Sequence, residues 1–136
     1  MTDSIASFSF DSPGSIFVDW GGARRIGETL SGWFSERSLL IVTDRFLHES
    51  GVLDPALASL AANGFSVTVF DQVVADPPES VLMACVGQGR DAGADLVLGF
   101  GGGSSMDIAK LAAVLLVGAQ ELSDLYGIGK ISGGRV

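Results

Sequence analysis

The apolar residues of this chain fall into blocks of strand-like and helix-like spacing. Residues 39–42 form a continuous apolar run, a second run follows Asp95 and reaches Phe100, and residues 65–70 alternate apolar and polar positions. A run without alternation is typical of a strand that is covered on both faces. Apolar residues recur at helical spacing between and after these strands, and we expect helices at 23–31, 54–63, 79–92 and 105–116.

This order of elements predicts an α/β fold. Strands that alternate with helices over short loops form a parallel sheet with right-handed crossovers. We therefore expect a doubly wound, mostly parallel sheet with helices on both faces. Asp54 is expected to be the N-cap of the second helix, with Pro55 at its first position. The last helix is expected to turn three apolar positions inward: Ile108, Ala112 and Leu115 or Leu116.

An N-terminal β-hairpin is expected before the first helix. Residues 8–10 read Phe-Ser-Phe and residues 15–18 read Ser-Ile-Phe-Val, both compatible with strands, and the turn between them, Asp11–Gly14, contains both proline and glycine. One use of such a hairpin is to cover the edge of the sheet.

Size and charge narrow the classes of function. With 136 residues the chain fits one domain. Its net charge of −8 argues against a nucleic-acid partner. The single cysteine, Cys85, cannot form an intramolecular disulfide and is expected in the core. No apolar run reaches the ~20 residues of a membrane span, and the first ten residues lack the features of a signal peptide, so we expect a cytoplasmic protein without membrane contact.

The candidate chemistry lies where the third strand ends. Residues 95–100 lead into Gly101, Gly102, Gly103, Ser104 and Ser105, directly before a helix. Glycine has no Cβ, so backbone N–H groups at such a turn can surround an anion, most simply a nucleotide phosphate. Alternatively, the two serine hydroxyls cap the helix. Residues 44 and 71–76 also follow strand ends, so all three segments are expected along one edge of the sheet.

The ten residues from Gly101 to Lys110 read Gly-Gly-Gly-Ser-x-x-Asp-x-Ala-Lys at their fixed positions. This pattern resembles the nucleotide-binding signature of the iron-containing (group III) alcohol dehydrogenases. Glycerol dehydrogenases usually carry Lys at the position of Ser104, and dehydroquinate synthases lack the final Asp-x-Ala-Lys. The resemblance implies the N-terminal domain of a dehydroquinate synthase-like fold, with residues 1–136 as the NAD-binding domain and the helical, metal-binding C-terminal domain absent from this chain.

The resemblance also assigns roles to individual residues. Asp44 corresponds to an acidic residue that contacts the adenosine ribose and favours NAD over NADP; otherwise it caps the following turn. Asp107, expected on the first turn of the helix, and Lys110 either contact the cofactor or pair with each other. Asp76 stands where the family frequently has Asn, which leaves its role open. The implied cofactor-binding residues are Asp44, Gly101, Gly102, Gly103, Ser104, Asp107 and Lys110.

The implied function is that of the N-terminal part of a metal-dependent alcohol dehydrogenase, which transfers hydride between an alcohol or aldehyde and NAD(H). In that family one Asp and three His of the C-terminal domain hold the metal, Fe or Zn. This chain has one histidine, His48, on an expected surface turn, so we expect neither a metal site nor catalytic residues here and no turnover by this piece alone. The full protein is expected to be a homodimer to which the hairpin contributes. The alternative is a stand-alone nucleotide-binding or regulatory module.

Overall fold

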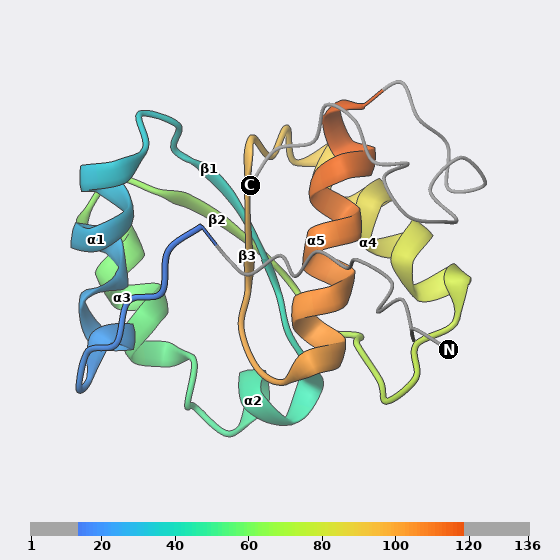
Figure 1. The fold of residues 1–136 in the computed structure, drawn as a ribbon, viewed down its shortest axis with the longest axis horizontal. Helices are drawn as coiled ribbons and strands as arrows, with labels where there is room; N and C mark the ends of the chain where they lie inside the picture. The colour runs from blue at the N-terminus through green and yellow to red at the C-terminus, as the bar shows by residue number, and fades with distance from the viewer. Residues whose placement is uncertain (1–13, 119–136) are drawn as a thin grey trace, which may run out of the picture.

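The sheet has three parallel strands in the order β2-β1-β3 (Figure 1). The computed structural model describes residues 14–118. Within them the strands are β1 (Ser38–Val42), β2 (Ser66–Phe70) and β3 (Leu96–Gly99). The helices are the 3-10 helix η1 (Gly22–Arg25) and the α-helices α1 (Ile26–Trp33), α2 (Arg45–Glu49), α3 (Asp54–Ala62), α4 (Glu79–Asp91) and α5 (Gly103–Val117).

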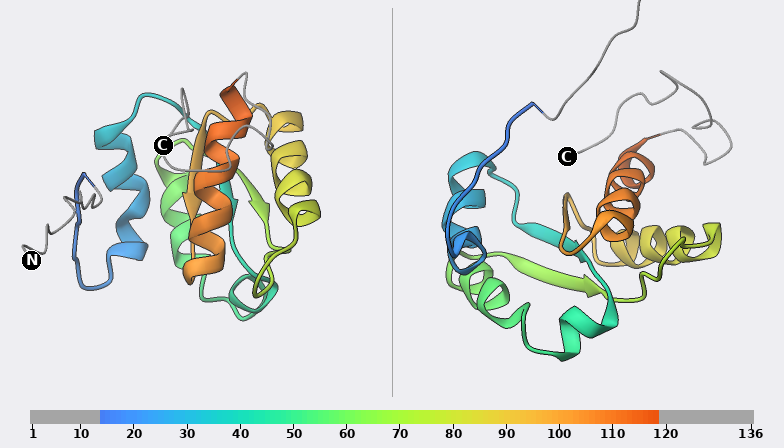
Figure 2. Two further views of the ribbon diagram at one scale, coloured as in Figure 1. Left: turned by 45° about the vertical axis from the view of Figure 1, so that its right-hand side comes forward. Right: turned by 60° about the horizontal axis from the view of Figure 1, so that its bottom comes forward.

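The central strand β1 is covered on both faces, as its unbroken apolar run predicts. Leu40 and Val42 belong to a core formed with α4 and α5. Leu39 and Ile41 belong to a second core formed with α1 and α3 on the other face. Figure 2 shows the two helix pairs on opposite sides of the sheet. The doubly wound architecture with parallel strands is therefore confirmed for the described residues.

Helix α5 packs as its apolar spacing predicts. Ile108, Ala112 and Leu115 are at most 4% exposed, and all three belong to the core on the α4 and α5 face of the sheet. Cys85 on α4 is fully buried in the same core, as expected. These residues hold α5 against β3, so the position of the glycine segment at its N-terminus is fixed by packing.

Two helix starts and one turn differ from the prediction. Asp54 is the first residue of α3, and Leu53 precedes it as the N-cap. Helix α5 begins at Gly103 with Gly102 as its N-cap and without a side-chain capping bond, so neither serine caps it. The expected surface turn at His48 is the five-residue helix α2. A turn of this length has too few apolar positions to show a helical period, which is why the sequence does not reveal it.

The predicted hairpin is not seen. Its first strand and most of its turn lie outside the described residues, and no strand is assigned to 15–18. Ile16, Phe17 and Val18 are 64–90% exposed, so these apolar positions do not mark a half-buried strand. Phe17 instead contacts Trp33 of α1 edge to face, with the ring centroids 6.2 Å apart.

None of the helices within residues 14–118 is long and apolar enough to cross a membrane.

Candidate functional site

The candidate site lies at the carboxyl ends of the three strands. The chain passes from β1 to β2 on one side and then returns past β1 to β3 on the other, so the order of strands reverses at β1. Open α/β sheets bind ligands at such a point, beyond the carboxyl ends of the strands. A cleft of about 330 Å³ opens there, and segments that follow each strand line it: Asp44, Val73, Val74, Ala75, Gly102, Gly103, Ser104 and Ser105.

One wall of the cleft, which we call the glycine wall, is formed by residues 102–105. Gly102 and Gly103 are exposed, and their N–H groups and those of Ser104 and Ser105 have no acceptor within residues 14–118. The first N–H groups of a helix have no partner inside the helix and carry its partial positive charge. The glycine wall therefore offers free donors to a ligand in the cleft.

The glycines at this strand end fall into two kinds. A Cβ on Gly99 would lie 3.1 Å from the Cα of Met106, and Gly101 has a φ of +137°, which side chains disfavour. Both positions need glycine for the fold. Gly102 has an ordinary φ of −85°, and a Cβ on it or on Gly103 would meet no atom of the described residues within 4 Å. Packing and backbone conformation therefore do not explain glycine at these two positions.

The opposite wall, which we call the side-chain wall, is formed by Asp44 and residues 73–75. Backbone bonds join the two segments: Thr43 N–H donates to Phe70 O at 2.9 Å, and Val73 N–H donates to Thr43 O at 3.3 Å. An isolated bridge also pairs Asp44 with Gln72. The end of β1 and the loop after β2 thus form one continuous surface.

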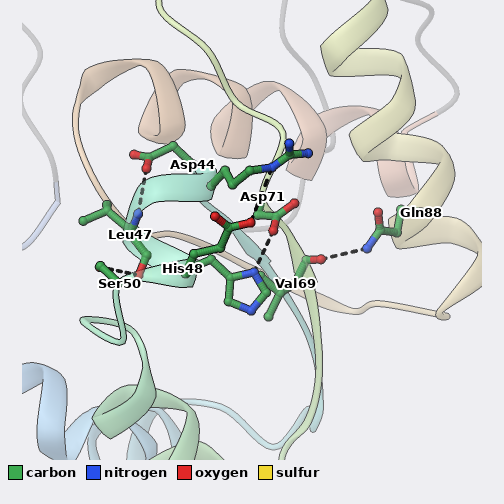
Figure 3. Close-up of polar contacts among 9 residues, drawn as sticks. Asp44, Leu47, His48, Ser50, Val69, Asp71 and Gln88 are labelled. Atoms are coloured by element: carbon green, nitrogen blue, oxygen red, sulfur yellow. Dashed lines mark hydrogen bonds and ion pairs between the residues drawn. The ribbon is translucent and has the colours of Figure 1, made fainter.

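Asp44 is held by the helix that follows it. Its Oδ1 accepts a hydrogen bond from the Leu47 N–H at 2.9 Å and so caps α2 (Figure 3). Capping is one of the two roles that the sequence allows for this residue. Oδ2 has no partner within residues 14–118. One carboxylate oxygen therefore fixes the side chain, and the other is free to accept a hydrogen bond from a ligand.

The structure brings together Asp44, Gly102, Gly103 and Ser104 of the predicted site residues, and it places the others outside the lining of the cleft. The sequence predicts Asp107 on the first turn of the helix. Because α5 begins at Gly103, Asp107 is the fifth helical residue and lies beyond the first turn, so this prediction is wrong. Asp107 and Lys110 are both exposed and form no ion pair with each other. The side chain of Leu47 packs against Gly101, because a Cβ on Gly101 would lie 3.0 Å from the Leu47 Cδ1 atom.

The loop after β2 lines the cleft through its apolar middle. The sequence places residues 71–76 at this edge of the sheet, and only Val73, Val74 and Ala75 of them line the cleft. Asp76, next to Ala75, has a φ of +45°, a left-handed conformation that Asp tolerates better than most residues. The sequence can place Val73, Val74 and Ala75 at the site only through their position after a strand, because their side chains are apolar and unreactive.

Other candidate chemistry is weak in the described residues. Burial raises the pKa of the Cys85 thiol to about 12, so this cysteine is no nucleophile at neutral pH. Within residues 14–118 no three His, Cys, Asp or Glu side chains converge as metal ligands. A catalytic zinc or iron site needs about three such ligands. These residues therefore do not fit a metal site, and we derive no step through a metal.

The comparisons with known proteins agree on one family. A family model described as iron-containing alcohol dehydrogenase matches residues 13–135. Long-chain-alcohol dehydrogenase 1 of Geobacillus thermodenitrificans is 36% identical over 125 residues, which are 92% of this chain and 31% of that protein. NAD-dependent methanol dehydrogenase of Bacillus methanolicus is 25% identical over 90% of this chain and 32% of its own length. The chain thus spans about a third of the length of these relatives.

Solved structures give the same result. NADH-dependent butanol dehydrogenase A of Thermotoga maritima superposes with a TM-score of 0.78 at 28% identity, over 93% of this chain and 31% of that chain. A 1,3-propanediol oxidoreductase shares the fold with a TM-score of 0.85 at 24% identity, over 95% of this chain and 34% of its own. The matched region is the N-terminal region of these enzymes. The chain belongs to the iron-containing alcohol dehydrogenase family.

Proposed function

We propose that the cleft binds NAD, with its diphosphate against the glycine wall. One observation carries this proposal. Gly102 and Gly103 line the cleft, and neither the backbone conformation nor the packing requires glycine at these positions. A side chain at either position would project into open space, where the phosphates would approach the backbone. The free N–H groups of residues 102–105 then donate to the phosphate oxygens.

Asp44 supports NAD over NADP. Within residues 14–118 it is the one charged side chain that lines the cleft, and its Oδ2 has no partner there. A carboxylate accepts hydrogen bonds from the two hydroxyls of an unmodified ribose. It repels a ribose 2′-phosphate, and no cation among the described residues that line the cleft compensates for that repulsion. Asp107, Lys110 and Gly101 remain predicted contacts for parts of the cofactor beyond the cleft.

We further propose that the chain is the dinucleotide-binding portion of an alcohol dehydrogenase. Membership of the family and the name of the Bacillus methanolicus relative, an NAD-dependent methanol dehydrogenase, support this proposal. When bound, the cofactor would supply a nicotinamide ring, which is a hydride acceptor in NAD and a hydride donor in NADH. The described residues of this chain bind and orient the cofactor. An Fe or Zn ion and an alcohol or aldehyde would be held by parts of the full protein outside this chain.

Two more predictions belong to the same proposal. The homodimer and the cytoplasmic location expected from the sequence stay predictions for the full protein. The partners we propose are small alcohols or aldehydes, without a nucleic acid or a membrane.

Substitution of the two unexplained glycines tests the proposal. We expect Gly102→Ala and Gly103→Ala each to weaken NAD binding by about 10-fold in calorimetric titration, because a methyl group displaces the phosphates. Both variants should melt within about 2 °C of the unchanged chain, since the added Cβ meets no protein atom. Gly87→Ala is the matched control, because a Cβ there also meets nothing within 4 Å and Gly87 lies on α4, outside the lining of the cleft.

Two results would contradict the proposal. NAD affinity that is unchanged in both variants would show that the phosphates do not lie against the glycine wall. Tight binding of AMP with no gain from the second nucleotide of NAD would favour the stand-alone nucleotide-binding module.

A further inference from the structure

The short helix α2 is joined to one wall of the cleft and packs beside the start of the other. At its start, Asp44 belongs to the side-chain wall and caps the helix through the Leu47 N–H. The side chain of Leu47 packs against Gly101, directly before the glycine wall. A helix of five residues is not stable by itself. Contacts of α2 with the rest of the fold therefore determine where the Asp44 carboxylate lies.

One side-chain bond ties α2 to the neighbouring strand. Nδ1 of His48 lies 2.7 Å from Oδ2 of Asp71, the first residue after β2 (Figure 3). The two side chains are 36% and 26% exposed, so the bond is partly shielded from water. The proton at Nδ1 is present in the imidazolium and in one neutral tautomer, and His48 can donate it to the carboxylate in either form.

The other ion pair of α2 has no such effect. Arg45 and Glu49 lie four residues apart on the same helix at 3.9 Å, and their side chains are about 70% exposed. This pair links α2 only to itself. The backbone bonds between the end of β1 and the loop after β2 involve Thr43, and the isolated bridge involves Asp44 and Gln72. None of them reaches a residue of α2 itself. Among the polar contacts of the described residues, His48 with Asp71 is the one that fixes the far end of α2 to β2.

We propose that His48 and Asp71 are a positioning pair for Asp44. By fixing the end of α2 to the end of β2, the pair holds the N-cap carboxylate in the orientation that leaves Oδ2 open to a ribose hydroxyl. This inference rests on the proposed binding of NAD. It adds two residues that do not line the cleft themselves.

A double-mutant cycle on the 136-residue chain tests the pair. We expect His48→Leu to weaken NAD binding about 5-fold in calorimetric titration. His48→Asn should stay within about 2-fold of the unchanged chain, because its amide nitrogen occupies the position of Nδ1 and can donate to Asp71. In an Asp44→Asn background, His48→Leu should cause no further loss. A merely structural role would not produce that dependence on Asp44.

Two further variants complete the test. Glu49→Gln breaks the other ion pair of α2 and is the matched control, with unchanged affinity expected. Asp71→Ala breaks the proposed bond from the other side, and it replaces His48→Leu if that variant does not fold. An unchanged affinity in His48→Leu, or the same 5-fold loss with and without Asp44, would overturn the positioning role. If Gly103→Ala still weakens NAD binding in that case, the proposed function stands without the pair, whereas a chain that does not bind NAD at all overturns both.

Discussion

The two walls of the cleft are built from different parts of the chain. The glycine wall is a single segment, residues 102–105, and it presents backbone N–H groups. The side-chain wall joins Asp44, after β1, to residues 73–75, after β2, and it presents one carboxylate and an apolar surface. The first wall depends on the absence of side chains at Gly102 and Gly103. The second depends on tertiary contacts that bring distant side chains together.

This difference suggests that the two walls bind different parts of the proposed ligand. Backbone N–H donors at the start of a helix suit a phosphate group, which is a charged acceptor of hydrogen bonds. A fixed carboxylate beside apolar residues suits a nucleoside, which has hydroxyl groups and an apolar ring. Removing features of one wall at a time should therefore separate effects on the fold, on affinity and on the choice between NAD and NADP.

The largest effect is expected where the glycine segment meets the fold. Gly101→Ala should lower the free energy of unfolding by about 3 kcal/mol, because alanine is strained at a φ of +137° and its Cβ would lie 3.0 Å from the Leu47 Cδ1 atom. Urea unfolding measures this loss. Gly102→Ala should change the free energy of unfolding by less than about 0.5 kcal/mol. Equal losses in the two variants would show that the two kinds of glycine do not differ.

The second effect separates the two roles of Asp44. Asp44→Ala should cost about 1 kcal/mol of stability through the lost N-cap and about 10-fold in NAD affinity through the lost ribose contact. Asp44→Asn keeps a capping oxygen, so it should recover most of the stability. It should narrow the preference for NAD over NADP, because the amide does not repel a 2′-phosphate. Calorimetry with both dinucleotides and a thermal melt check these outcomes, and an unchanged preference in Asp44→Asn would remove Asp44 from the nucleotide contacts.

The sequence predicts the sheet and the glycine wall for a physical reason. The run at residues 39–42 has no polar interruption because β1 is buried on both faces, and burial on both faces is visible in the sequence alone. The glycine wall is one contiguous segment between a strand and a helix, so its chemistry is local. The family signature lies in the same ten residues and needs no tertiary structure to be recognised.

The side-chain wall and helix α2 are less visible in the sequence. Val73, Val74 and Ala75 line the cleft only because strand pairing places the end of β2 beside β1. His48 meets Asp71 across 23 residues of sequence, and no local pattern relates them. The expected strand at 15–18 is wrong for the opposite reason, because its apolar pattern is local but no sheet neighbour is present among the described residues.

The smallest effect tests whether the apolar part of the side-chain wall contributes to binding. Val74 lines the cleft and is 52% exposed, so a ligand against this wall would remove much of its remaining surface from water. Val74→Ser should weaken NAD binding about 3-fold, which corresponds to about 0.6 kcal/mol of apolar contact. Val52→Ser is a matched control, since Val52 is 54% exposed and lies outside the lining of the cleft. An equal affinity of the two variants for NAD would show that Val74 adds nothing to binding, and the contribution of this wall would then rest on the Asp44 carboxylate.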